Sequence, residues 1–187
     1  MTNRASSAGF VLAGGASRRM GRDKALLPLG ETTMIEQIAS AVRGAAGNVT
    51  LIGPMARYQH LGLPVIPDEI GNCGPLGGLY TALRVTEADW NIVVACDMPG
   101  VTEAFLTELL QAARTSAVDC LVPEMNGNIE PLCAAYHAHV VAAARSAIDR
   151  KLFKMQDFIS SLCAVRWPVS DRRPLQNVNT PAEWGTR

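Results

Sequence analysis

The stretch GFVLAGGASRRMGRDK, residues 9–24, decides how the beginning of the chain folds. Its first five residues are apolar or small, which predicts a short buried strand at residues 9–13 that stops at two glycines. Gly14 and Gly15 can adopt positive φ and let backbone N–H groups approach an anion closely. Four basic residues and one acidic residue then give a local charge of +3: Arg18, Arg19, Arg22, Lys24 and Asp23. The pattern predicts an anion-binding loop, for which the alternative is a surface turn with solvated charges.

Two common phosphate-binding motifs are absent from this loop. The dinucleotide fingerprint G-x-G-x-x-G does not fit glycines at positions 14, 15 and 21. The P-loop pattern G-x-x-x-x-G-K-[ST] fails because Arg22 follows Gly21 and Ala25 follows Lys24. The sequence therefore argues against a hydride-transferring dinucleotide fold and against an ordinary ATPase.

Beyond the loop, candidate strands alternate with candidate helices. Strands are expected at 49–52, 63–66, 91–95, 120–122, 131–136 and 164–168, and helices at 33–43, 75–84, 102–113 and 137–150. This alternation predicts an α/β fold with a mostly parallel central sheet covered on both faces. The loops after parallel strands open at one edge, where ligands bind; here they are residues 14–24, 53–57, 67–77 and 96–99. The pattern leaves open whether residues 152–161 form a fixed helix or a lid.

Length and composition favour one domain, 1–187, with residues 1–8 as a flexible N-terminus. Apolar residues make up 48% and charged residues 18%, which favours a packed core over disorder. Lys plus Arg equals Asp plus Glu at 17 each, which argues against a broad nucleic-acid-binding surface.

No apolar run suits a signal peptide or approaches the roughly 20 residues of a membrane span. The five scattered cysteines form no C-x-x-C pair and predict reduced thiols in the cytoplasm.

Two aspartates follow predicted strands at the ligand-binding edge. Asp97 comes directly after the strand at 91–95, where a buried carboxylate is costly unless a cation neutralises it. Mg²⁺, which takes one or two carboxylates together with phosphate oxygens, would do so; the alternative is an aspartate that caps the turn before Pro99. Asp68 follows the strand at 63–66 and suits a ribose hydroxyl or a guanine N–H, with a plain turn aspartate as the alternative.

The segment L-A-G-G-x-S-x-R-M-G-x-D-K, read from Leu12 to Lys24, resembles the signature of the small nucleotidyltransferases, and of the molybdenum cofactor guanylyltransferases in particular. The resemblance continues in order through PVIPDEIGNCGPLGGLYTAL (64–83), VVACDMP (93–99), EPLCAAYH (130–137) and LQNVNTPAEW (175–184). It covers nearly the whole chain. It implies a single-domain, three-layer α/β/α Rossmann-like fold and the transfer of GMP from GTP to molybdopterin, with release of pyrophosphate.

The resemblance also implies roles for individual residues. Lys24, Arg19 and Asp97 would be catalytic, with Asp97 holding Mg²⁺. The nucleotide would contact Leu12, Ala13, Gly14, Gly15, Lys24, Gly53, Asp68 and Asp97, and the molybdopterin acceptor would contact Gly77, Gly78, Asn177 and Asn179. Proteins that deliver molybdopterin and molybdoenzymes that receive the product are the implied protein partners.

Three alternatives stay open at this point. A cytidylyltransferase of the same cofactor is disfavoured because such sequences tend to read L-A-A-G where this chain has L-A-G-G at 12–15, but Gly53-Pro54 leaves base choice less certain. Sugar-nucleotide pyrophosphorylases are disfavoured because their G-x-G-T-R-L pattern is missing. A non-catalytic nucleotide-binding relative would be expected to lose Lys24 or Asp97, and both are present.

Overall fold

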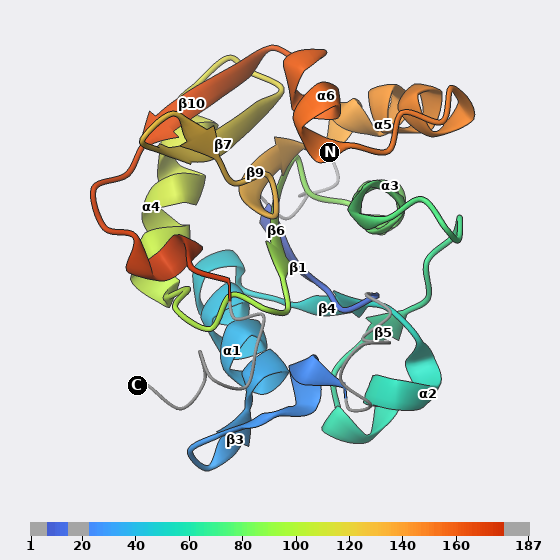
Figure 1. The fold of residues 1–187 in the computed structure, drawn as a ribbon, viewed down its shortest axis with the longest axis vertical. Helices are drawn as coiled ribbons and strands as arrows, with labels where there is room; N and C mark the ends of the chain where they lie inside the picture. Colours follow the sequence, from blue (N-terminus) through green and yellow to red (C-terminus); the bar gives the residue numbers. More distant parts are fainter. Residues whose placement is uncertain (1–6, 15–22, 178–187) are drawn as a thin grey trace, which may run out of the picture.

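The central feature of the structure, a computed structural model that describes residues 7–14 and 23–177, is a twisted sheet with β1 (Ser7–Leu12) near its middle (Figure 1). The strand order is β10-β7-β9-β6-β1-β4-β5, and β8 pairs with β7. The bounds of the other strands of this sheet are Thr50–Ile52 (β4), Val65–Ile66 (β5), Trp90–Ala95 (β6), Cys120–Met125 (β7), Asn128–Ile129 (β8), Cys133–His137 (β9) and Ala164–Pro168 (β10). The strand predicted at 9–13 and the six strands predicted after it all correspond to strands of this sheet, with bounds that agree within a few residues.

The sheet is mostly parallel, as the sequence predicts, but β9 runs the other way. β1 is parallel to β4 and β6, and β10 is parallel to β7. β9 lies antiparallel between β6 and β7. The start of β9 therefore lies at the edge where the neighbouring strands end. The hydrogen bond from the Ala95 N–H to the Leu132 carbonyl, 2.7 Å long, joins the two segments there.

Helices cover both faces of the sheet and give three layers (Figure 1). On one face lie α1 (Met34–Ala46) and α4 (Glu103–Arg114), and on the other lie α3 (Pro75–Val85), α5 (Val141–Asp149) and α6 (Met155–Ser160). Side chains alternate along β1, so that Val11 packs with α1 and α4 while Phe10 and Leu12 pack with α3. The observed architecture is the predicted three-layer α/β/α arrangement, and residues 155–160 form a helix with a buried apolar face.

Local sequence signals explain where the helices begin. The Thr33 N–H donates to Oε2 of Glu36 at 2.9 Å, which closes the first turn of α1. Thr102 Oγ1 accepts the N–H of Phe105 at 3.2 Å before α4. α3 begins with Pro75 directly after Gly74, whose φ of 59° is a backbone conformation that favours glycine.

Several short elements were not predicted. They are the hairpin of β2 (Pro28–Leu29) and β3 (Thr32–Thr33), the strand β8, the helix α2 (Met55–Tyr58), and the 3₁₀ turns η1 (Lys24–Leu26), η2 (Gln59–Leu61) and η4 (Arg173–Leu175). The 3₁₀ turn η3 (Ala138–Val140) falls inside a predicted helix. The predicted helix at 137–150 is divided into η3 and α5. Within residues 7–14 and 23–177, no helix has the length and apolar character needed to cross a bilayer.

Candidate functional site

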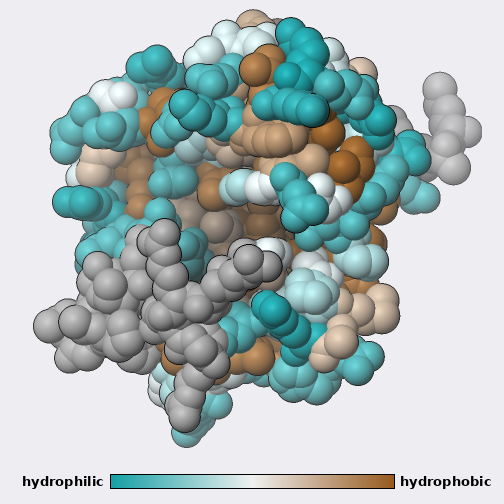
Figure 2. All heavy atoms as spheres, turned by 45° about the vertical axis from the view of Figure 1, so that its right-hand side comes forward, coloured by the Kyte–Doolittle hydropathy of each residue, from teal (hydrophilic) through white to brown (hydrophobic). Residues whose placement is uncertain are grey.

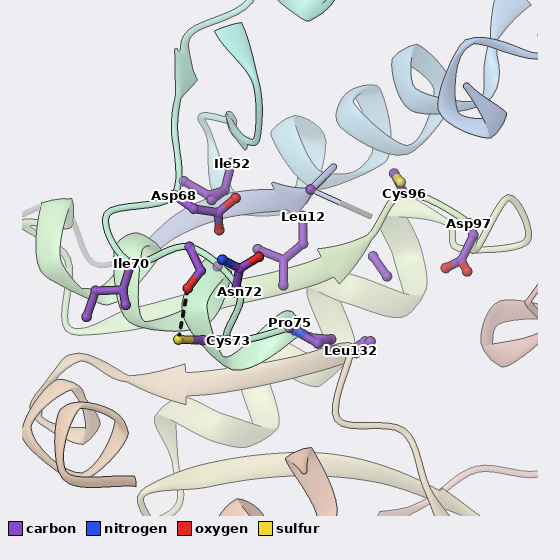
Figure 3. Close-up of a pocket in the computed structure, with 15 residues that line it drawn as sticks. Leu12, Ile52, Asp68, Ile70, Asn72, Cys73, Pro75, Cys96, Asp97 and Leu132 are labelled. Atoms are coloured by element: carbon purple, nitrogen blue, oxygen red, sulfur yellow. Dashed lines mark hydrogen bonds between the residues drawn. The ribbon is translucent and has the colours of Figure 1, made fainter. Parts of the chain in front are cut away.

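A cavity of about 520 Å³ opens at the edge where β1, β4, β5 and β6 end (Figure 3). In this view Leu12 lies between Asp68 on one side and Cys96 and Asp97 on the other. The lining residues include five that the sequence assigned to the site, namely Leu12, Gly14, Asp68, Gly78 and Asp97. The loops after β1, β5 and β6 thus meet as the edge rule predicts.

Two of the glycines that line the cavity, Gly14 and Gly78, allow the chain to close around the Asp68 carboxylate. A Cβ atom on Gly14 would lie 2.9 Å from Oδ2 of Asp68. A Cβ atom on Gly78 would lie 3.0 Å from Cδ2 of Leu12 and 3.5 Å from Oδ1 of Asp68. Burial raises the pKa of Asp68 above its ordinary value. Any side chain at either position would therefore displace the carboxylate or the floor of the cavity.

Asp97 is the more deeply placed acid, and Lys24 lies within electrostatic range of it. Burial raises the pKa of Asp97, and the positive charge of Lys24, together with backbone hydrogen bonding, partly opposes that shift. The same burial, with the Asp97 charge beside it, raises the pKa of the Cys96 thiol to about 12 and keeps that thiol protonated. A desolvated carboxylate favours a cation as partner.

The carboxylates at the cavity suit a hard divalent cation such as Mg²⁺. Among residues 7–14 and 23–177 there is no group of three or more His, Cys, Asp or Glu side chains able to enclose an ion. Mg²⁺ needs no such group, because it commonly keeps several waters and takes one or two carboxylates plus substrate phosphates. Asp97 is the residue that would hold it.

Three other residues, expected to contact the nucleotide or the acceptor, are buried and do not belong to the cavity lining. Ala13 is buried, and its N–H donates to the Ile52 carbonyl at 2.8 Å. The Gly53 N–H donates to the Ile66 carbonyl at 2.9 Å, so that this donor is already engaged within the sheet. A Cβ atom on Gly77 would lie 2.8 Å from the Ile70 carbonyl, and glycine is needed there for α3 to pack under the loop.

The expected acceptor side is only partly described. Gly15, Arg19 and Asn179 lie outside the described residues. Asn177 is exposed and follows η4, which packs on the loop after Asp97. A Cβ atom on Gly100 would overlap the backbone carbonyl of Arg173. This close approach of two backbones brings the segment leading to Asn177 toward the Asp97 loop.

Gly100→Ala is expected to displace η4 and to destabilise the protein by about 1–3 kcal/mol, as overpacked sites commonly do. Thermal unfolding measures the loss of stability, and the rate of tryptic cleavage after Arg172 measures the displacement of η4. Gly44→Ala is the matched control, because the atoms nearest to its added methyl group belong to the exposed side chain of Glu103, which can move aside, and not to backbone. Equal cleavage rates in the two variants would show that η4 does not need this contact.

Glu130 is a residue near this site that the sequence reasoning did not single out. Its carboxylate accepts the N–H of Leu132, a lining residue, at 3.3 Å. Burial and the nearby negative charge of Asp97 raise the pKa of Glu130. In the segment EPLCAAYH a glutamate precedes an apolar strand. A residue before a strand lies at the ligand-binding edge only when that strand is antiparallel to its neighbours, as β9 is.

Raised carboxyl pKa values predict that Glu130→Gln stabilises the ligand-free protein at pH 7. A carboxyl group whose pKa is higher in the folded than in the unfolded state contributes fully to stability below its unfolded-state pKa. That contribution is lost as pH rises through the folded-state pKa, because the group is then ionised where the fold disfavours its charge. The difference in Tm between wild type and Glu130→Gln should therefore be largest near pH 7 and shrink toward pH 4. The exposed Glu108→Gln serves as control. A variant less stable than wild type at pH 7 would contradict the expectation.

The arrangement suits a ligand that has an apolar, flat part and that brings hydrogen-bond donors or a bound cation to the carboxylates. The lining includes the apolar side chains of Ile52, Ile70 and Leu132, together with the carboxylates of Asp68 and Asp97. The face shown in Figure 2 is hollowed near its middle, where brown, apolar side chains are exposed among teal, polar ones. A purine nucleotide whose phosphates carry a divalent cation has these properties.

Sequence comparison places this site in a known family. The family model of the MobA-like NTP transferase domain matches residues 9–165. The probable molybdenum cofactor guanylyltransferase of Carboxydothermus hydrogenoformans is 35% identical, covering 93% of this chain and 91% of the relative. That of Mycobacterium marinum is also 35% identical, covering 95% and 91%.

Solved structures share the fold. Molybdopterin-guanine dinucleotide biosynthesis protein A from Archaeoglobus fulgidus superposes with a TM-score of 0.77 at 25% identity, covering 94% of each chain. Rv0371C from Mycobacterium tuberculosis, solved in complex with manganese, superposes with a TM-score of 0.70 at 19% identity, covering 97% of this chain and 96% of that one. The sequence matches span most of the chain, and the residues around the cavity lie within the matched range. The chain belongs to the MobA-like NTP transferase family.

Proposed function

We propose that the protein transfers GMP from GTP to the terminal phosphate of molybdopterin and forms molybdopterin guanine dinucleotide. The observation that carries the proposal is that Asp68 and Asp97 line one cavity at the carboxyl edge of the sheet, with Lys24 near enough to Asp97 to lower its pKa. The names of the relatives, guanylyltransferases of the molybdenum cofactor, support GTP and molybdopterin as the substrates.

The reaction requires positioning and charge neutralisation more than proton transfer. An oxygen of the molybdopterin phosphate forms a bond to the α-phosphorus of GTP, and the bond between that phosphorus and pyrophosphate breaks. The attacking oxygen is already anionic at neutral pH, so that no strong general base is needed. Lys24 and Arg19 would neutralise the charge on the α-phosphate and the leaving pyrophosphate. The backbone after β1 would hold the nucleotide in line.

Mg²⁺ held by Asp97 would supply additional positive charge at the phosphate oxygens. The manganese complex of the related fold supports a divalent cation as the metal. Asp68 would accept a hydrogen bond from a ribose hydroxyl or a guanine N–H, and the apolar wall would cover the base. Gly78 lies beside Asp68, and Asn177 follows η4; both would face the acceptor side.

The five cysteines are free thiols: Cys73, Cys96, Cys120, Cys133 and Cys163. Free thiols suit a reducing compartment, and we place the reaction in the cytoplasm on that ground. Proteins that supply molybdopterin and molybdoenzymes that take the product would be the partners there.

Ligand-dependent thermal stability tests the choice of nucleotide. With Mg²⁺ present, GTP is expected to raise Tm more than CTP or ATP, since a ligand at 100 times its Kd adds roughly 2.7 kcal/mol of stability. Release of pyrophosphate from GTP on addition of molybdopterin then separates an enzyme from a non-catalytic binder. A larger shift with CTP, and turnover with CTP alone, would assign the cytidylyltransferase reaction instead.

A further inference from the structure

The buried side chain of Tyr58 contacts the residues on both sides of the glycine-rich segment. Tyr58 is the last residue of α2 and is only 1% exposed. Its hydroxyl oxygen lies 3.1 Å from the carbonyl oxygen of Ala13, directly after β1. The same hydroxyl lies 2.8 Å from Oδ2 of Asp23, directly before η1. One phenol group therefore joins the two points that residues 14–22 connect in sequence.

Asp23 extends this contact to the backbone that carries Lys24. Its Oδ1 accepts the N–H of Ala25 at 3.1 Å and caps η1, whose first residue is Lys24. Its Oδ2 accepts the Tyr58 hydroxyl and lies 3.6 Å from Nη1 of Arg57. The carboxylate thus holds the chain on both sides of Lys24, and Tyr58 holds the carboxylate.

The hydroxyl, and not only the ring, is needed for this arrangement. The Asp23 side chain is only 16% exposed. Removal of a hydrogen-bond donor to such a carboxylate destabilises the folded protein, because water cannot fully replace the donor. Burial and the Asp23 carboxylate raise the pKa of Tyr58 far above its ordinary value, so that the hydroxyl keeps its proton and donates it. A phenylalanine would fill the same space in the core but leave Asp23 and Ala13 without this partner.

We propose that Tyr58 is a positioning residue whose hydroxyl holds Asp23 close to Ala13 and thereby fixes the direction of Lys24. Tyr58 acts through Asp23 and does not touch substrate. The kinetic part of this proposal rests on the proposed function, whereas the structural part does not.

Tyr58→Phe is expected to lower kcat about tenfold, with KM for GTP changed less than about threefold, because small displacements of a group acting in the transition state reduce kcat first. Asp23→Asn should have a similar effect. The double variant should also lose about tenfold, not a hundredfold, because both changes remove one interaction. Tyr80→Phe is the matched control: Tyr80 is a buried tyrosine on α3, and its hydroxyl interacts with Arg145 of α5.

Tryptic cleavage after Lys24 gives a readout that does not depend on the reaction. Loss of one buried hydrogen bond should accelerate this cleavage by about fivefold in Tyr58→Phe, but not in Tyr80→Phe. Unchanged cleavage, an unchanged kcat in an active enzyme, or multiplicative kinetic losses in the double variant would overturn the proposal. Faster cleavage in a protein whose wild type does not turn over GTP would support the positioning contact and reject the proposed function.

Discussion

Asp97→Asn is expected to lower kcat by about 10²–10³-fold, the loss that follows removal of one preorganised electrostatic contact to a transition state. The amide keeps the size of the side chain but has no charge with which to hold a divalent cation. Pyrophosphate release at saturating GTP and increasing Mg²⁺ measures the effect. Near-normal turnover at high Mg²⁺ would remove Asp97 from the proposed metal site.

The same substitution should make the ligand-free protein more stable. Burial raises the pKa of Asp97, which means that its charge opposes folding at pH 7. A neutral amide removes that penalty, and each kcal/mol recovered corresponds to a rise in Tm of roughly 2–4 °C for a protein of this size. Added Mg²⁺ and GTP should stabilise the wild type more than Asp97→Asn, with the exposed Glu108→Gln behaving as the wild type does. A fall in Tm would assign Asp97 a structural role.

Lys24→Ala is expected to lower kcat by about 10²-fold or more while KM for GTP rises less than about fivefold. Lys24 lies near enough to Asp97 to lower its pKa, which places the ammonium group toward the end of the cavity that we assign to the phosphates. An interaction that strengthens as charge develops affects kcat, whereas one made equally in the bound substrate affects KM.

Steady-state kinetics with varied GTP separates these two effects for Lys24. Lys154→Ala is the control, since Lys154 is an exposed lysine before α6 and makes no side-chain capping hydrogen bond. An increase in KM alone would reassign Lys24 to ground-state binding of the triphosphate.

The longer elements were predicted well, whether or not they are buried. The strand expected at 91–95 is β6, all six residues of which are buried, and the strand expected at 164–168 has the observed bounds of β10, which is partly exposed. The hairpin of β2 and β3 and the strand β8 were missed because their two-residue strands contain no apolar run, whereas the two-residue strand β5 consists of Val65 and Ile66. Their pairing depends on tertiary contacts that local composition does not encode.

One topological rule predicted where the candidate site lies, and the same rule explains why Glu130 was missed. Leu12, Gly14, Asp68 and Asp97 lie at or after the ends of parallel strands, which the rule brings together at one edge of the sheet. Glu130 precedes its strand and reaches the same edge only because β9 is antiparallel. Strand direction is set by the pairing partner and not by the alternation of side chains, so the apolar run at 131–136 could not reveal it.

The raised carboxyl pKa values at this edge have a consequence for the life of the protein in the cell. Three carboxylates, Asp68, Asp97 and Glu130, are held where their charges oppose folding at neutral pH. Bound nucleotide and metal would offset that opposition, so the unfolded fraction exposed to proteases is expected to fall as ligand concentration rises. The lifetime of the protein in the cell should therefore increase with the supply of its substrate.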